Sequence, residues 1–254
     1  MLDRFTLKDN FNELVKLCSD SENTITVSSY LTGEKFFQQS NPRLLVIGRA
    51  LNGWPLAFND LEKWEKHNTI GTVLKSRTLK SNEKATAEDC KGLGWVNTYI
   101  KKSESSKRRY LTANTPFWKA AREATITVHP SLSEQSHDFY QYIAWTNLYK
   151  AAPQSGGNPS DALCKKQQKV CNDILRQEIQ ILKPTHILII AKSNSTDKTR
   201  ENLWIAPFEQ VLREISKIEI NGTRIKIVCI HRPEFQCWSS IKKEISALKN
   251  QETI

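Results

Sequence analysis

Four short apolar runs form the framework of the chain. They read RLLVIG (43–48), IAWTNLY (143–149), THILIIA (185–191) and RIKIVCIH (224–231), and none alternates cleanly with polar residues. Continuous runs of β-branched and leucine residues are typical of parallel strands that helices cover on both faces. The pattern therefore predicts a buried parallel sheet of four strands.

Helical patterns separate and follow these strands. Ser160 can cap a helix that continues at helical spacing to Leu182 and ends before Pro184. Pro116 suits the first turn of another helix, where its missing N–H is not needed. The other predicted helices cover 9–17, 201–215 and 238–248. Strands alternating with helices predict an α/β fold, a three-layer αβα domain around a central, mostly parallel four-stranded sheet.

Composition narrows the class of protein. With 254 residues, 39% of them hydrophobic and 25% charged, the chain suits a single domain over 1–254. The longest unbroken apolar stretch, Ile187–Ala191, is far shorter than the ~20 residues that cross a bilayer. Six cysteines without a C-x-x-C pair favour a reducing cytoplasm over a zinc ribbon or a disulfide framework. We expect a cytoplasmic monomer with no membrane contact, metal or cofactor.

The charge indicates a nucleic-acid partner. Lys and Arg number 37 against 27 Asp and Glu, a net charge of +10, and the chain holds seven Trp. A basic surface with flat rings suits phosphates and unstacked bases. An insertion at about 60–110 holds twelve Lys or Arg against seven Asp or Glu. It is interpreted either as a solvated segment or as a DNA-contacting arm that includes Lys107, Arg108 and Arg109.

The ends of the strands carry the candidate chemistry, because ligands of such sheets bind beyond the carboxyl ends of the strands. The first strand is followed by GRALNGWP (48–55). Gly48 allows a tight turn that brings backbone N–H groups close to a ligand. The glycine spacing fits neither a dinucleotide fingerprint nor a phosphate P-loop.

The second strand ends in TNLYKAAPQSGGNPS (146–160). The amide of Asn147 both donates and accepts, which matches the edge of a pyrimidine; an ordinary strand-end cap is the alternative. The loop after it suits phosphate contacts, through Lys150, Ser155 and Gly156.

The last strand is followed by HRPEF (231–235). A histidine at the carboxyl end of a core strand stands where an active-site loop belongs. A structural role for His231 is the alternative.

The order and content of these blocks resemble the uracil-DNA glycosylase superfamily. There, a GQDPY, GMNPG or GEGPG motif follows the first strand, a second strand carries the base-reading Asn, and an HPS-type loop follows the last strand. The stretch TNLYK…GGNPS…ILRQEIQILKPTHILIIA is similar to the microbial branches, and ANTPFWKAAREA resembles the helix start of the mismatch-directed branch. The resemblance covers roughly 43–236.

The resemblance implies a uracil-DNA glycosylase-like fold and a set of site residues. Phe117 would stack on a flipped base, Asn147 would read its edge, and His231 would donate a hydrogen bond to its carbonyl oxygen as negative charge develops. Gly48 and Arg49 would complete the base-binding loop. A purely hydrolytic enzyme needs no lysine nucleophile.

Three departures from the superfamily pattern alter these expectations. Ala50 stands where the superfamily has its water-positioning residue, so Asn52 and Asp60 are the nearest catalytic candidates. Ala151 replaces the cysteine that an iron–sulfur branch has, so no cluster is expected. The HPS loop is altered, and the DNA wedge would then come from one of three residues, Arg232, Phe235 or Trp238.

The resemblance, with these departures, implies a monofunctional DNA glycosylase that flips out and hydrolytically removes a pyrimidine. Leu51-Asn52-Gly53 lacks the aromatic residue that excludes C5 substituents in the strict uracil enzymes, which favours a C5-modified cytosine in viral DNA and a role in defence. Uracil or mismatched thymine in repair is the second substrate class. The alternatives are a catalytically inactive nucleic-acid-binding protein on the same fold and a nucleoside hydrolase.

Overall fold

The computed structural model describes residues 4–18, 25–27, 30–39, 42–50, 93–97, 99–101, 109–132, 138–153, 157–192 and 204–249. A central sheet of five strands has the order β11-β8-β3-β6-β2. Four strands run parallel, and they are β3 (Leu44–Gly48), β6 (Ile143–Asn147), β8 (His186–Lys192) and β11 (Lys226–His231).

The four predicted strands are confirmed, but the prediction of four strands in the sheet was wrong. The fifth strand, β2 (Leu31–Thr32), pairs antiparallel with β6 at the edge of the sheet. A strand of two residues is too short to show a recognisable alternation of apolar and polar positions.

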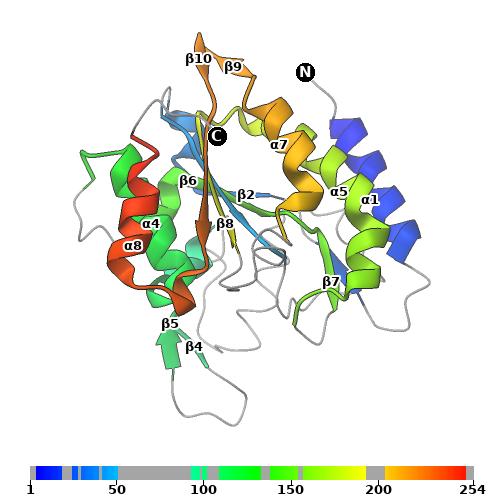
Figure 1. The fold of residues 1–254 in the computed structure, drawn as a ribbon, viewed down its shortest axis with the longest axis horizontal. Helices are drawn as coiled ribbons and strands as arrows, with labels where there is room; N and C mark the ends of the chain where they lie inside the picture. The colour runs from blue at the N-terminus through cyan, green and yellow to red at the C-terminus, as the bar shows by residue number, and fades with distance from the viewer. Residues whose placement is uncertain are drawn as a thin grey trace.

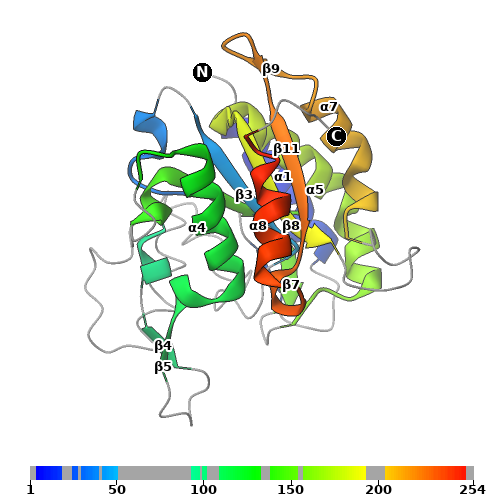
Figure 2. The same ribbon diagram turned by 60° about the vertical axis from the view of Figure 1, so that its left-hand side comes forward.

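Helices cover both faces of the sheet (Figures 1 and 2). One layer holds α4 (Pro116–Val128) and α8 (Trp238–Ser246), and the other holds α1 (Arg4–Cys18), α5 (Asp161–Leu182) and α7 (Glu209–Ile215). Consequently, successive side chains of β3 enter different cores: Leu44 and Val46 pack on the α4–α8 side, and Leu45 and Ile47 on the α5–α7 side.

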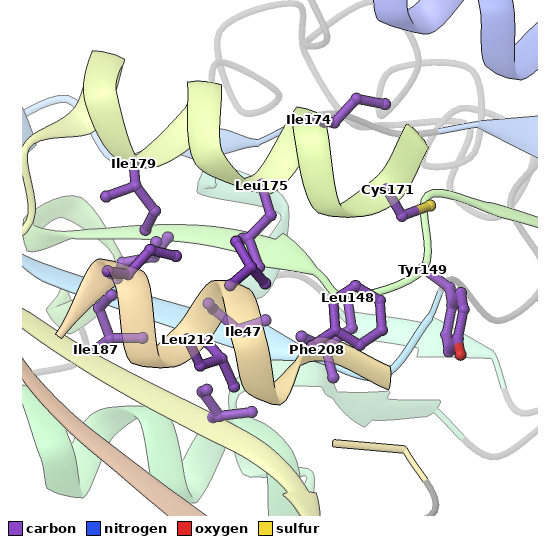
Figure 3. Close-up of a cluster of buried hydrophobic side chains, with 14 of the residues drawn as sticks. Ile47, Leu148, Tyr149, Cys171, Ile174, Leu175, Ile179, Ile187, Phe208 and Leu212 are labelled. Atoms are coloured by element: carbon purple, nitrogen blue, oxygen red, sulfur yellow. The ribbon is translucent and has the colours of Figure 1, made fainter. Parts of the chain in front are cut away.

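The core on the α5–α7 side is continuous from helix to sheet. Figure 3 shows Leu175 and Ile179 of α5 pointing into the same cluster as Leu212 of α7 and Ile47 of β3. All five residues of β3 and of β6 are buried, which is why neither strand alternates between apolar and polar positions in the sequence.

The boundaries of α5 follow from local chemistry. The Ser160 side chain accepts a hydrogen bond from the N–H of Leu163 and caps the first turn. Lys183 takes the left-handed conformation (φ 47°) that commonly ends a helix, directly before Pro184.

The other predicted helices differ from the structure mainly in length. Of the predicted helix 201–215, residues 201–203 lie outside the described residues, and the described part is helical over a shorter range than predicted: α7 covers Glu209–Ile215 and follows a 3-10 turn, η6 (Ala206–Phe208). Pro207 lies in that turn and cannot sit inside an α-helix without breaking its hydrogen bonds. Helix α1 is longer than predicted, and α8 ends at Ser246.

Short elements complete the described fold. β1 (Ile25–Val27) pairs with β7 (Ala151–Pro153), and β9 (Glu219–Ile220) with β10 (Thr223–Arg224) through a turn at Asn221 and Gly222, both at positive φ. Further 3-10 turns in the described part of the chain are η1 (Phe36–Gln38), η4 (Thr112–Asn114), η5 (Phe139–Tyr142) and η7 (Pro233–Phe235). Among the described helices, none has the length and apolar character needed to cross a bilayer.

The carboxyl-terminal part of the basic insertion belongs to the fold. It forms η3 (Gly94–Asn97) and an antiparallel pair, β4 (Tyr99–Lys101) with β5 (Arg109–Leu111). Leu93 and Val96 are fully buried in the α4–α8 core, so this part is not a solvated segment. The β4–β5 pair projects beyond the end of the sheet toward which β11 points (Figures 1 and 2).

Candidate functional site

The candidate site lies at the carboxyl edge of the parallel strands. Gly48, Asn147, Lys192 and His231 are the last residues of β3, β6, β8 and β11. Gly48 is the register partner of Asn147, and Lys192 is that of His231. Three sequence blocks that are far apart in the chain are therefore brought to one edge of the sheet, as expected for a parallel α/β fold.

Gly48, Asn147 and Phe117 converge at one point of this edge. A Cβ atom added to Gly48 would lie 2.5 Å from Oδ1 of Asn147 and 3.4 Å from Cε2 of Phe117. The absence of a side chain at Gly48 is what lets the amide and the ring approach the backbone of β3. Phe117, in the first turn of α4, packs edge-on against Trp118 with ring centroids 5.1 Å apart.

The side-chain amide of Asn147 is buried without a full set of hydrogen bonds. The residue is 2% exposed, and its Nδ2 has no hydrogen-bond partner among the described residues. Leaving a buried donor unpaired costs about 1–3 kcal/mol, so such groups are rare in native proteins and often mark functional sites. The amide is thus positioned to bind a group that the described residues do not supply.

The side chain of Lys150 lies inside the protein, where it cannot contact a DNA phosphate, so the predicted DNA contact of Lys150 was wrong. The side chain is fully buried, and its Nζ donates to Glu178 Oε2 (2.7 Å), Thr146 Oγ1 (2.7 Å) and the carbonyl oxygen of Asn147 (2.6 Å). These three bonds use every donor of the ammonium group. The ammonium group of Lys150 therefore holds the backbone of Asn147 in position.

The side chain of Arg49 contacts the carboxyl end of the neighbouring strand, β8. The pairing of β11 with β8 shifts register between Ile230 and His231. Such a bulge leaves an unpaired residue and redirects side chains near it. The Arg49 guanidinium donates to the carbonyl oxygens of Ala191 and Lys192, both at 3.0 Å, and lies over the ring of Trp204. Burial, and secondarily Arg232, lower the pKa of Arg49 to about 10.

The carboxylate of Glu244, which was not among the predicted site residues, contacts both the ring and the backbone of His231. Oε1 of Glu244 lies 2.9 Å from Nδ1 of His231, and Oε2 accepts the backbone N–H of the same residue at 3.0 Å. One glutamate on α8 therefore fixes both the backbone and the ring of the histidine. The two side chains keep 22% and 28% exposure, so the pair sits at the border of the core and the solvent.

The loop after His231 presents a charged and an aromatic side chain. Arg232 forms two hydrogen bonds with Glu234, at 2.8 and 3.3 Å. Trp238, the first residue of α8, is 36% exposed. Phe235 lies in η7, and its side chain is not among those described.

The structure leaves several predicted residues without a test. Asn52, Asp60, Ser155, Gly156, Lys107 and Arg108 lie outside the described residues, and Arg109 is described only as backbone of β5. Ala50 is described, and it packs against the hydrophobic core. In the described part of the chain, no group of three His, Cys, Asp or Glu side chains is arranged to hold a metal ion.

Glu178 and Glu244, which were not among the predicted site residues, share a signal in the sequence. Glu178 and Glu244 both lie on the apolar stripe of a helix: Glu178 next to Ile179 and four residues after Ile174, and Glu244 next to Ile245. An acid at a core-facing position is costly to bury unless it has a partner. The stripe could have indicated an inward-facing acid, but not the residue that it pairs with.

Neither protein-family models nor curated protein sequences match this chain.

Proposed function

We propose that the protein is a monofunctional DNA glycosylase that hydrolytically removes a flipped-out pyrimidine. The observation that carries the proposal is the buried amide of Asn147, whose Nδ2 has no partner among the described residues and which lies against Gly48 and beside Phe117. All three residues belong to the base-binding set that the resemblance implies.

An asparagine amide suits the edge of a pyrimidine. Uracil and thymine present an N–H beside a carbonyl oxygen, and cytosine presents an amino group beside a ring nitrogen acceptor. The amide matches either pair with its own donor and acceptor. The ring of Phe117 provides a flat apolar face on which a base can stack.

The surroundings of the site suit DNA as the carrier of that base. The protein has a net charge of +10, and the β4–β5 pair of the basic insertion projects at the same end of the sheet (Figure 2). Extrusion of a base from the duplex costs a few kcal/mol. The exposed Trp238 at the loop after His231 is suited to fill the space that the base leaves.

We further propose a C5-substituted cytosine as the preferred base, with uracil or mismatched thymine as the second substrate class. The support is the sequence Leu51-Asn52-Gly53, which has no aromatic residue to close the C5 side of a bound base.

A catalytically inactive DNA-binding protein is the second candidate function. Ala50 favours it, because an alanine packed on the core supplies no carboxylate where the superfamily positions its water. A nucleoside hydrolase is the third, and it would not need DNA.

One assay separates the three functions. Duplex and single-stranded oligonucleotides that carry uracil, a mismatched thymine, 5-hydroxymethylcytosine or its glucosylated form are incubated with the protein, and abasic sites are then cleaved with alkali. Strand breaks support the glycosylase, and binding without strand breaks supports the inactive DNA-binding protein. If the protein neither breaks nor binds the oligonucleotides, the nucleoside hydrolase is the remaining candidate, and an assay with free nucleosides tests it directly. Breaks from uracil alone would exclude the preference for modified cytosine.

A pair of asparagine variants ties the activity to the site. Asn147→Ala should reduce base release by about 10²–10³-fold, the loss typical of one positioned donor. Asn172→Ala is the matched control, because Asn172 is a partly buried asparagine on α5 that bonds the carbonyl of Pro207 and lies outside the site. Equal activity of both variants would mean that the pocket is elsewhere.

A further inference from the structure

We propose that Glu244 makes His231 the proton acceptor for the attacking water. The inference rests on the proposed function and assigns a role to Glu244, a residue outside the base-binding set. In this scheme His231 is the catalytic base, and Glu244 is a positioning residue that acts through it.

The contact between the two residues is two-pronged. Oε1 of Glu244 lies 2.9 Å from ring Nδ1, and Oε2 lies 3.0 Å from the backbone nitrogen of His231. Helix α8 packs back against β11, and the fully buried Ile241 and Ile245 on either side hold Glu244 on the inward face of the helix. The ring of His231 is therefore fixed in orientation as well as in position.

This geometry decides where the ring carries its proton. A carboxylate has only acceptors, so Nδ1 must donate to Oε1. In the neutral ring Nε2 then has the lone pair, and it accepts a proton instead of donating one. The resemblance implied that His231 donates to the carbonyl oxygen of the base, but a neutral ring bonded in this way cannot do so through Nε2.

The charges around the ring favour this role. Lys192 of β8 stands opposite His231 in register, and Arg49 of β3 donates to the carbonyl of Lys192. Arg232 in the next loop is bonded to Glu234, and Lys242 of α8 is paired with Glu123 of α4 at 3.3 Å.

Among these charged groups, Glu244 is the acid in direct contact with the ring of His231. It therefore stabilises the imidazolium that forms once His231 has accepted a proton.

The reaction step balances with these two residues. One O–H bond of water breaks as its proton moves to Nε2 of His231, and the water oxygen bonds to C1′ of the sugar. The C1′–N bond breaks, and its electron pair leaves with the pyrimidine. The released base then takes up a proton, and the imidazolium returns its proton to solvent. This role of His231 also explains how the water is activated although Ala50 supplies no carboxylate.

The test is the pH dependence of base release under single-turnover conditions. In the wild type the rate should rise with pH along a limb of unit slope and then level off, because the base acts only when neutral. Glu244→Gln keeps an oxygen near Nδ1 but removes the charge that favours the imidazolium. We expect its limb to move to lower pH and its plateau to fall by about 10- to 100-fold, within the contribution of a general base.

Two further variants control the experiment. Glu123→Gln removes the same charge from another contact of α8 and should keep the wild-type profile. Glu244→Asp keeps the charge and should keep the limb near its wild-type position. In addition, a long-range ¹H–¹⁵N spectrum of the wild type should place the proton of the neutral His231 ring on Nδ1, a readout that does not depend on the folding of any variant.

The outcomes distinguish this inference from the proposed function. A wild type that releases no base from any substrate defeats the proposed function and this inference with it. An active wild type whose rate falls as pH rises, or whose profile is unchanged in Glu244→Gln, defeats the inference alone. A neutral ring with its proton on Nε2 does the same.

Discussion

The ammonium group of Lys150 lies 2.7 Å from Oε2 of Glu178, and both side chains are fully buried. The same ammonium donates to the carbonyl oxygen of Asn147. The pair thus ties the end of β6 to α5 at the residue whose amide faces the candidate site. A charged pair in the core here supports the position of one polar group at the edge of the sheet.

Removal of one member of this pair should be far more damaging than removal of both. Lys150→Met should lower the free energy of unfolding by about 3–5 kcal/mol, because it leaves the carboxylate of Glu178 buried without its partner. The double variant Lys150→Met/Glu178→Leu should recover much of that loss, since it leaves no buried charge. Urea denaturation of the three proteins measures both effects. A single variant as stable as the wild type would contradict this account of the pair.

Gly48→Ala should inactivate the site without unfolding the protein. The added Cβ would meet Oδ1 of Asn147 at 2.5 Å, so the amide has to move away from the position that we propose for base recognition. Base release should fall by about 10²-fold or more, comparable to the loss of one positioned donor. Circular dichroism and thermal unfolding serve as the control for the fold. Full activity of this variant would show that the close approach of Gly48 and Asn147 has no functional role.

His186 should make the protein less stable in acid. The ring lies at the amino end of β8 with Nδ1 2.9 Å from Oγ1 of Thr185, a hydroxyl that itself accepts from the backbone N–H of Arg43. Burial, followed by the charge of Lys226, lowers the pKa of His186 from 6.5 to about 4. Between these two values the unfolded chain binds the extra proton and the folded protein does not. Stability is therefore complete above about pH 6.5 and is lost as the pH falls toward 4.

The full effect, reached below about pH 4, is on the order of 3 kcal/mol, from 1.36 kcal/mol for each unit of pKa shift. Urea denaturation at several pH values between 4 and 7 gives the slope. His186→Gln removes the titrating group, so its stability should depend less on pH over this range. An identical slope in the wild type and the variant would assign the acid sensitivity to other groups.

The basic insertion should control how DNA binding responds to salt. If Lys107, Arg108 and Arg109 contact phosphates, replacement of all three by Ala should flatten the plot of log affinity against log salt by more than about one unit, because each contact contributes ~0.9. Lys217, Arg224 and Lys249 form a matched control set, since all three are exposed. They lie near the amino end of β11, opposite the end that carries His231: Arg224 lies two residues before β11, Lys217 adjoins Ile218, which bonds Ile225, and the carbonyl of Lys249 accepts from Lys226. If the two triple variants changed the slope equally, the insertion would not be a specific part of the DNA-binding surface.

Much of the fold could be read from the sequence because the determining interactions are local. The strands β3, β6, β8 and β11 are buried on both faces, which is why none of them alternates cleanly between apolar and polar positions. Helix α5 begins after the side-chain cap of Ser160 and ends at Leu182, two residues before Pro184, as the sequence predicts. The edge of the sheet at which Gly48, Asn147 and His231 meet follows from the parallel order of the strands.

The chemistry at that edge was decided by tertiary structure. Lys150 appeared in the sequence as a basic residue in a polar loop, yet its ammonium lies in the core against Glu178. The sequence predicts His231 as a hydrogen-bond donor, and the structure adds Glu244, thirteen residues later, whose Oε1 lies 2.9 Å from Nδ1 of the ring. In both cases the partner is an acid on the apolar stripe of a helix. Hydrophobic spacing shows that such an acid faces inward, but only the packing of that helix against the sheet brings a particular base within hydrogen-bonding distance.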